Sequence, residues 1–198
     1  WVAYSGGIDS HVLLELTAKS FSNVRAVHIN HGTHPDDDQW QQHCEIICSE
    51  LNVPLHSIKV KTTPRLKQSY ETAARNARRD AWKNLLAADD LLLVAHHADD
   101  QAETILYRLL RGTGPRGLTG MQTYSAIGNA TLLRPFLNTR KKEILAYAQE
   151  RQLNWITDRS NQDNSIDRNY IRNNIMPQLQ ARWPQGINNI NRAGTICA

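Results

Sequence analysis

Ser5-Gly6-Gly7-Ile8-Asp9-Ser10 stands near the start of the chain, between a short apolar run (1–4) and a longer one (12–16). The first run is typical of a strand and the second of a helix. Two adjacent glycines let the backbone turn sharply between them. We therefore expect a strand, a glycine turn and a helix N-terminus in succession. Such a turn suits a phosphate group, because the first N–H groups of the helix point at the ligand.

The side chains of this stretch add to the prediction of a phosphate site. Ser5 and Ser10 supply hydroxyl donors, and Asp9 can hold Mg²⁺ that bridges phosphate oxygens. The lysine of the G-x-x-x-x-G-K-[ST] loop and the G-x-G-x-x-G spacing are both absent, which disfavours γ-phosphate transfer and dinucleotide binding. A plain turn is the alternative. The stretch resembles the SGGxDS loop of the PP-loop ATPases, which cleave ATP between the α- and β-phosphates and adenylate a substrate.

Composition restricts the class of protein. A chain of 198 residues with 40% hydrophobic content can form one domain, or one and a half. It has no apolar run of about 20 residues and no signal peptide, so we expect a cytoplasmic protein without a membrane segment. Cys44 and Cys48 lie four apart without a C-x-x-C motif and are expected as buried thiols in a reducing compartment. Because the chain begins inside a strand at Trp1, we expect an excised fragment.

Apolar patterns predict the remaining elements. Strands are expected at 1–4, 23–30, 55–60, 91–95 and 131–136, and helices include 40–51, 69–85 and 141–152. The first of these helices has the stripe Trp40, Cys44, Ile47 and Leu51, and the second has a cap at Ser69 and the stripe Ala74, Ala77, Ala81 and Leu85. The unbroken run 91–95 is typical of a central parallel strand that is covered on both faces.

A second polar motif, His96–Thr104 (HHADDQAET), follows the predicted strand 91–95. Ligand sites in open α/β sheets gather at such strand ends. Asp100 and Glu103 are one helical turn apart and can face one cation, whereas Asp99 and Asp100 do not share a face. Carboxylates at a helix start also complement the helix dipole, but histidine is not favoured there. A metal hydrolase remains a further alternative, although its companion acidic motifs are missing. A nucleotide–Mg²⁺ site is the favoured interpretation.

Arg78 lies on one face of the predicted helix 69–85. Glu71, Arg75 and Arg78 follow each other at helical spacing. Such a face is most often solvated and salt-bridged. A functional role for Arg78 is the alternative.

Four further arginines suit a polyanionic partner, in line with a net charge of +4. Arg111 and Arg116 lie in the glycine-rich stretch 111–121, which predicts a mobile lid or a grip on a phosphate backbone, with a plain linker as the alternative. Arg168 and Arg172 share a helical face, and the sequence shows no nearby acid that neutralises both. A solvated helical face is the alternative interpretation for this pair.

Together these motifs resemble the catalytic domain of the tRNA(Ile)-lysidine synthetase family, nearly from end to end. The matching stretches are Ser5–Ser10, Asn30–Gly32, Ala74–Arg78, His96–Thr104, Arg111–Gly114, Leu133–Pro135, Asp158–Asn161 and Arg168–Asn169. The HHxDDQAET and RGxG motifs are the most specific. The resemblance implies an α/β fold of PP-loop ATPase type, with a parallel (Rossmann-like) five-stranded sheet and helices on both faces. Residues 1–136 would form the ATP-binding core and 137–198 a helical part of the same domain, without the family's further tRNA-binding domains.

The resemblance also implies an activity. ATP would adenylate O2 of the wobble cytidine in the CAU anticodon of tRNA(Ile), with release of pyrophosphate. The ε-amine of L-lysine would then attack C2 and expel AMP. The partners are tRNA(Ile), L-lysine, ATP and Mg²⁺, and a homodimer is left open. Another PP-loop enzyme that thiolates a tRNA base, or a non-catalytic nucleotide-binding module, are the alternatives.

Site residues follow from the resemblance position by position. The loop residues Ser5, Gly6, Gly7, Ile8, Asp9 and Ser10 would hold ATP, and the backbone near His28 and Ile29 would meet adenine. Asp9 and Asp100 would hold Mg²⁺. The catalytic cleft would contain Arg78, His96, Asp100 and Glu103, with Glu103 as proton acceptor for the lysine amine. Contacts with tRNA would come from Arg111, Arg116, Arg168 and Arg172. Arg79 departs from the family, which often has tyrosine at this position.

Overall fold

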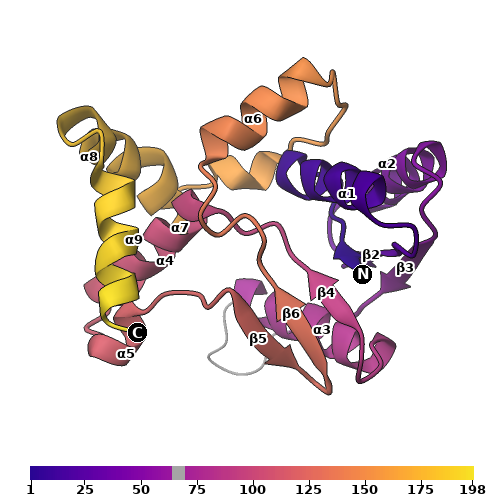
Figure 1. The fold of residues 1–198 in the computed structure, drawn as a ribbon, viewed down its shortest axis with the longest axis horizontal. Coiled ribbons are helices and arrows are strands. Elements are labelled where there is room, and N and C mark those ends of the chain that lie inside the picture. Colours follow the sequence, from indigo (N-terminus) through magenta and orange to yellow (C-terminus); the bar gives the residue numbers. More distant parts are fainter. Residues whose placement is uncertain (64–69) are drawn as a thin grey trace. The chain divides into compact units, whose positions relative to one another are not determined.

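The computed structural model describes residues 1–63 and 70–198 of the chain, which divide into two compact units. Unit 1 comprises Trp1–Ala95, Tyr124–Leu133 and Tyr147–Ile156, and unit 2 comprises His96–Thr123, Arg134–Ala146 and Thr157–Ala198. Figure 1 shows the elements of both units. The helix cap expected at Ser69 lies outside the described residues.

Unit 1 contains a six-stranded sheet. Its strands are β1 (Val2–Ala3), β2 (Ala26–Asn30), β3 (Leu55–Lys59), β4 (Leu91–Leu93), β5 (Tyr124–Ile127) and β6 (Ala130–Leu133). Their order is β3-β2-β1-β4-β6-β5, and every neighbouring pair is parallel except β5 with β6. All five expected strands form, so the α/β class with a mainly parallel sheet is confirmed.

The sixth strand, β5, was not expected. Ile127 pairs with Ala130 across the two-residue turn Gly128-Asn129, and Gly128 has φ +61°. Glycine tolerates positive φ, which one class of two-residue hairpin turn requires at its first central position. This hairpin adds an antiparallel edge strand and makes the sheet mixed.

The strand order reverses between β1 and β4. From β1 the chain proceeds outward to β2 and β3, and it returns to the other side of β1 at β4. In open α/β sheets a ligand binds where the order reverses, beyond the carboxyl ends of the strands. The glycine stretch 5–10 follows β1 directly and therefore lies at this position.

Three helices cover the sheet of unit 1 on both faces. They are α1 (Ile8–Ser20), α2 (Asp37–Glu50) and α3 (Tyr70–Leu85). Figure 1 shows α1 and α2 on one side of the sheet and α3 on the other. Cys44 and Ile47 in the predicted stripe of α2 are buried, as expected, and Cys44 and Cys48 are free thiols.

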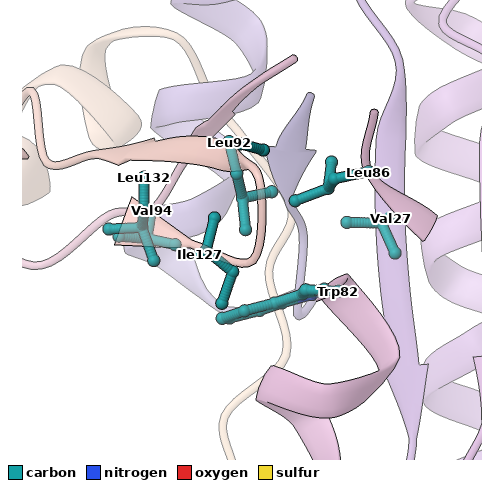
Figure 2. Packing of buried hydrophobic residues seen from close by; sticks show 8 residues of the cluster. Val27, Trp82, Leu86, Leu92, Val94, Ile127 and Leu132 are labelled. Atoms are coloured by element: carbon teal, nitrogen blue, oxygen red, sulfur yellow. The ribbon is translucent and has the colours of Figure 1, made fainter. Parts of the chain in front are cut away.

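The buried face of α3 is displaced from the predicted stripe. Ala73 and Trp82 are its buried residues, whereas the expected positions are only partly covered; these are Ala74, Ala77, Ala81 and Leu85. Trp82 packs in a cluster with Leu92 and Ile127 of the sheet, and Figure 2 shows its ring beside Ile127. The large indole, which the alanine pattern did not take into account, determines which face of the helix is buried.

Unit 2 is helical. Its elements are α4 (Ala98–Leu110), α5 (Pro115–Leu118), the start of α6 (Lys141–Glu150), the 3₁₀ turn η1 (Arg159–Gln162), α7 (Asp167–Tyr170), the π-helix η2 (Ile171–Ile175), α8 (Met176–Arg182) and α9 (Gly186–Ile196). A core of Ala102, Ile171, Met176 and Ile187 joins α4 to the C-terminal helices. Among the described residues, no helix is both long and apolar enough to cross a membrane.

The glycine-rich stretch 111–121 is more ordered than its composition predicts. It contains the short helix α5, and the side-chain amide of Gln101 bonds to both backbone groups of Met121, at 2.9 Å to the carbonyl oxygen and 2.7 Å to the nitrogen. Arg108 Nη1 donates to the carbonyl oxygens of Gly117 at 3.0 Å and Gly120 at 2.8 Å. Residues 117–121 are therefore bound to α4, in contrast to the irregular loop that we expected.

We expect Trp82→Ala to lower the free energy of unfolding by about 3–5 kcal/mol, because it leaves a large cavity between α3 and the sheet. Chemical denaturation followed by circular dichroism measures this loss. Phe21→Ala is the matched control, since Phe21 belongs to the same unit and is 64% exposed. Equal effects of the two substitutions would contradict the packing described for Trp82.

Candidate functional site

The phosphate loop, residues 5–10, is closed by its own serines. The Ser10 hydroxyl donates to the Gly7 carbonyl oxygen at 2.9 Å and accepts the Ser5 N–H at 3.2 Å. Ser5 Oγ lies 3.0 Å from Ser10 Oγ and accepts the Gly7 N–H at 3.4 Å. The hydroxyl groups, which we expected as donors to a ligand, therefore also shape the loop itself.

Gly6 is the position where this loop requires glycine. Its φ is +82°, and a Cβ atom there would lie 2.5 Å from Ile156 Cδ1 and 3.2 Å from Cys44 Sγ. The Ile156 N–H donates to the Gly6 carbonyl oxygen at 2.9 Å. Ile156 and Cys44 thus pack against Gly6 on the side where a Cβ atom would project. The sequence alone did not indicate these contacts.

Helix α1 begins at the loop without a side-chain cap. Its N-cap is Gly7, which has no side chain to bond the first N–H groups of the helix. Asp9 is half-buried in the first turn. Uncapped N–H groups and the positive end of the helix dipole fit a bound anion. The phosphates of ATP therefore suit this end of α1.

The end of β2 lies next to the phosphate loop in the sheet. The register of β1 with β2 ends at Ala3 and Val27, so His28 and Ile29 lie beyond it. The His28 side chain is buried, and its Nδ1 must carry a proton because it lies 3.0 Å from the Tyr4 carbonyl oxygen. Burial lowers the pKa of His28. Only the backbone of His28 is thus suited to a ligand, and its contact with adenine stays a prediction.

Asn30 is a residue of this region that sequence reasoning left without a role. It is 2% exposed and donates from Nδ2 to Gln41 Oε1 at 3.0 Å and to Asp38 Oδ1 at 3.3 Å. Its Oδ1 accepts the Gly32 N–H at 2.9 Å. Asn30 therefore fixes the turn that follows β2.

Arg78, also in unit 1, lies on α3. Its guanidinium carbon is 5.4 Å from the centre of the Trp82 ring, and the residue is half-buried. The prediction of a solvated face thus fits Glu71 and Arg75, which are exposed. It fits Arg78 less well, because Arg78 is half-buried. A catalytic role of Arg78 stays a prediction.

In unit 2, His97 is the N-cap of α4. Its Nδ1 accepts the Asp100 N–H at 3.2 Å, and Asp100 Oδ2 accepts the His97 N–H at 3.1 Å. This reciprocal pair is a capping box. We expected histidine to argue against a capping role, and for His97 this was wrong. The three-residue spacing from His97 to Asp100 was the available signal.

Asp100 and Glu103 of α4 meet Arg168 and Arg172, and we call these side chains the charge cluster. Asp100 Oδ1 accepts Nη2–H of Arg168 at 3.2 Å and of Arg172 at 3.0 Å. Glu103 binds Arg172 in bidentate fashion, with 2.8 Å to both Nε and Nη2, and lies 3.4 Å from Arg168 Nε. The sequence showed no nearby acid that neutralises both arginines, and the acids that pair with them here are 65 to 72 positions away.

The electrostatic environment keeps Asp100 ionised. Burial opposes the charged form, but electrostatic interactions with His97, followed by Arg168, His96 and Arg172, outweigh it and lower the pKa of Asp100. Asp99 faces elsewhere, as expected, and pairs with Arg140 at 3.1 Å.

Asp100, one of the two predicted Mg²⁺ ligands, already has hydrogen-bond partners in the structure. Asp100 uses both carboxylate oxygens for the cap and the charge cluster, so it does not fit a metal ligand as it stands. No group of three or more His, Cys, Asp or Glu side chains that could hold a metal occurs in 1–63 and 70–198.

Arg111 and Arg116 lie apart from the charge cluster. Arg111 follows α4 at its C-terminal end, about 16 Å from Asp100 for eleven residues of helical rise. Arg111 stacks on the Tyr107 ring at 5.3 Å and is exposed, as is Arg116 in α5. The four predicted tRNA contacts thus form two separate groups.

We expect Gly6→Ala to destabilise unit 1 by about 1–2 kcal/mol, because alanine is strained at positive φ. The end of the Ile156 side chain can move, so the clash adds little. Gly7→Ala is the control: Gly7 has φ −75°, and a Cβ atom there makes only ordinary contacts, the nearest with Ser5 Oγ at 3.5 Å. Thermal denaturation compares the two. Equal stability of both variants would contradict the loop conformation.

A family model and curated proteins both match this chain over most of its length. Residues 1–179 match the family model described as a PP-loop domain. The chain is 48% identical to tRNA(Ile)-lysidine synthase of Pseudomonas fluorescens over 93% of its own length and 42% of that protein. It is 46% identical to the enzyme of that name from Pseudomonas putida, over 98% of the chain and 46% of that protein. The chain thus spans less than half the length of these curated relatives.

One solved structure has a similar fold. The U34-tRNA thiolase NcsA from Methanococcus maripaludis, solved with its [4Fe-4S] cluster, matches with a TM-score of 0.79 and 16% sequence identity. The match covers 98% of this chain and 69% of that chain.

Proposed function

The chain belongs to the PP-loop domain family, and from this premise we propose that it is the ATP-using catalytic part of a tRNA(Ile)-lysidine synthase. The observation that carries the proposal is the 48% identity to a protein of that name over 93% of the chain. The uncapped start of α1 at Gly7 supports ATP as the nucleotide. We place the reaction in the bacterial cytoplasm.

The proposed reaction has two steps. The wobble cytidine O2 of tRNA(Ile) with anticodon CAU attacks the α-phosphorus of ATP, and the bond to the β-phosphate breaks with loss of pyrophosphate. The ε-amine of L-lysine then attacks C2, gives up a proton, and the C2–O2 bond breaks with loss of AMP. Both steps need cationic or N–H groups that offset charge on phosphate.

We assign the phosphates of ATP to the loop Ser5–Ser10 and adenine to the backbone near His28. Bound Mg²⁺ would offset the negative charge on the phosphates. Asp9 fits that cation because it belongs to the phosphate loop and lies in the first turn of α1. Asp100 was predicted as its second ligand, but its oxygens already accept hydrogen bonds from His97, Arg168 and Arg172.

Cys44 and Cys48 are poorly suited to carry sulfur in a transfer reaction. Cys44 and Cys48 are buried, and burial raises the pKa of Cys48 to about 12. A sulfur carrier must react as a thiolate, which these surroundings oppose.

We expect the full-length protein to convert ATP to AMP and pyrophosphate only with tRNA(Ile), and to incorporate one labelled lysine per tRNA. Asp9→Asn is expected to lose this activity while it keeps its circular dichroism spectrum. Formation of ADP, or transfer of sulfur without lysine, would contradict the proposal. Binding of ATP without any tRNA-dependent pyrophosphate release would favour a nucleotide sensor instead.

We propose that Arg111 and Arg116 contact tRNA phosphates. Each contact adds about −0.7 to −0.9 to the slope of log affinity against log salt concentration. Arg111→Ala and Arg116→Ala are each expected to reduce the steepness by that amount in filter binding. Arg25→Ala is the control, because Arg25 is exposed just before β2, at the amino ends of the strands. An unchanged slope in both variants would place the RNA surface elsewhere.

A further inference from the structure

The phosphate loop of unit 1 is contacted by a segment from much later in the chain, residues 154–156, which we call the strap. The strap follows α6 in irregular backbone and belongs to unit 1. Gln152 has φ 53°, an uncommon conformation for a residue other than glycine, and turns the chain at the end of α6. The Leu153 N–H donates to the Ala148 carbonyl oxygen at 2.9 Å and fixes this turn.

Two hydrogen bonds join the strap to the phosphate loop and to α1. The Ile156 N–H donates to the Gly6 carbonyl oxygen at 2.9 Å. The Asn154 carbonyl oxygen lies 2.8 Å from His11 Nδ1. Because a carbonyl oxygen only accepts, Nδ1 of His11 must carry the proton of this bond. The strap therefore uses main-chain groups for both bonds, and His11 is the one side chain that takes part in them.

His11 is enclosed on α1 next to the phosphate loop. It is 3% exposed, and its ring lies edge-on to Tyr4, with 5.8 Å between the ring centres and 69° between the planes. Tyr4 is the residue directly before the loop. A buried donor without an acceptor is costly, so the Asn154 carbonyl oxygen is needed where it lies. His11 thereby fixes the strap relative to α1.

The bond from Ile156 controls the direction of one peptide group in the loop. In a planar trans peptide, the carbonyl oxygen of Gly6 and the N–H of Gly7 point in opposite directions. While the Gly6 oxygen accepts from the strap, the Gly7 N–H therefore points to the other side, where Ser5 Oγ lies 3.4 Å away. Two glycines resist rotation of this peptide least. After such a rotation the carbonyl oxygen would face the anion and repel it, whereas N–H groups attract it.

We propose that His11 and the strap position the Gly6–Gly7 peptide for the phosphates of ATP, with the carbonyl oxygen held away from the anion and the N–H held toward it. The inference rests on the proposed function, because it requires that the loop binds ATP. His11 is a positioning residue that acts through the strap and does not itself contact the nucleotide. The affinity for ATP thus depends on a contact between residues 143 positions apart.

The first experiment measures Kd for ATP in the full-length protein without tRNA, by isothermal titration calorimetry. His11→Phe keeps an aromatic ring but loses the donor, and we expect ATP to bind roughly three- to tenfold more weakly, as for the loss of one hydrogen bond. His11→Asn keeps an N–H donor near the position of Nδ1, so its Kd is expected to stay within about twofold of the unmodified protein. Asn154→Ala is the control with unchanged Kd, because its carbonyl oxygen makes the bond and its side chain is exposed.

Adenosine, which lacks phosphates, separates positioning of the loop from general damage to the site. Its Kd is expected to be the same in His11→Phe and in the unmodified protein. A parallel loss of adenosine and ATP binding would overturn the proposal. An unchanged Kd for ATP in His11→Phe would also overturn it, as would equal weakening by His11→Phe and His11→Asn, which would assign the effect to packing of the ring.

The second experiment tests the Ile156 bond directly. Ile156→Val keeps the N–H and shortens the side chain, whereas Ile156→Pro removes the N–H. We expect an unchanged Kd for ATP in the valine variant and a Kd raised at least about threefold in the proline variant, with circular dichroism to check that both fold. Equal Kd values in the two folded variants would overturn the proposal.

Hydrogen exchange in the unmodified protein gives a test that does not depend on the folding of a variant. Exchange of the Ile156 amide is expected to slow when ATP is added, because the bond and the bound phosphates favour the same peptide orientation. Exchange that ATP leaves unchanged would overturn the proposal. Failure of the unmodified full-length protein to bind ATP at all would instead refute the proposed function, so the two failures are distinguishable.

Discussion

The positive φ of Gly6 is the constraint on which the nucleotide-binding part of unit 1 depends. The strand β1 contains only two residues, and the chain must turn within a few residues to begin α1. Only glycine adopts this conformation without strain. The space behind it is filled by Ile156 and Cys44. The turn thereby leaves the uncapped N–H groups of α1 beyond the carboxyl end of β1, where the strand order reverses.

A comparable constraint in unit 2 is electrostatic: two buried carboxylates need cationic partners. Asp100 and Glu103 are buried on the first turns of α4, and a buried carboxylate without a cation is costly. Arg168 and Arg172 supply the compensating charge and thereby fix η2 relative to α4. Removal of one partner would leave an unpaired buried charge, which costs about 3–5 kcal/mol. The charge cluster therefore stabilises the contact between η2 and α4.

Local patterns allowed much of this fold to be predicted. Alternation of apolar runs with helical stripes located all five strands of the mainly parallel part, and the Ser-Gly-Gly motif located the loop. Contacts between distant residues could not be predicted: Arg172 and Glu103 are 69 positions apart, and no spacing rule links them. The hairpin at Gly128-Asn129 and the cap at His97 were different, since both had local signals: the Gly-Asn pair and the three-residue spacing from His97 to Asp100.

The role of Asp100 shows why a motif alone does not determine chemistry. The spacing of Asp100 and Glu103 places both carboxylates on one face of α4, and the structure agrees with that part of the inference. Spacing cannot state which cation reaches them, because Mg²⁺ and guanidinium both satisfy paired carboxylates. That choice depends on the chain segment that folds against α4. In this protein the segment carries two arginines, and both pair with the acids of α4.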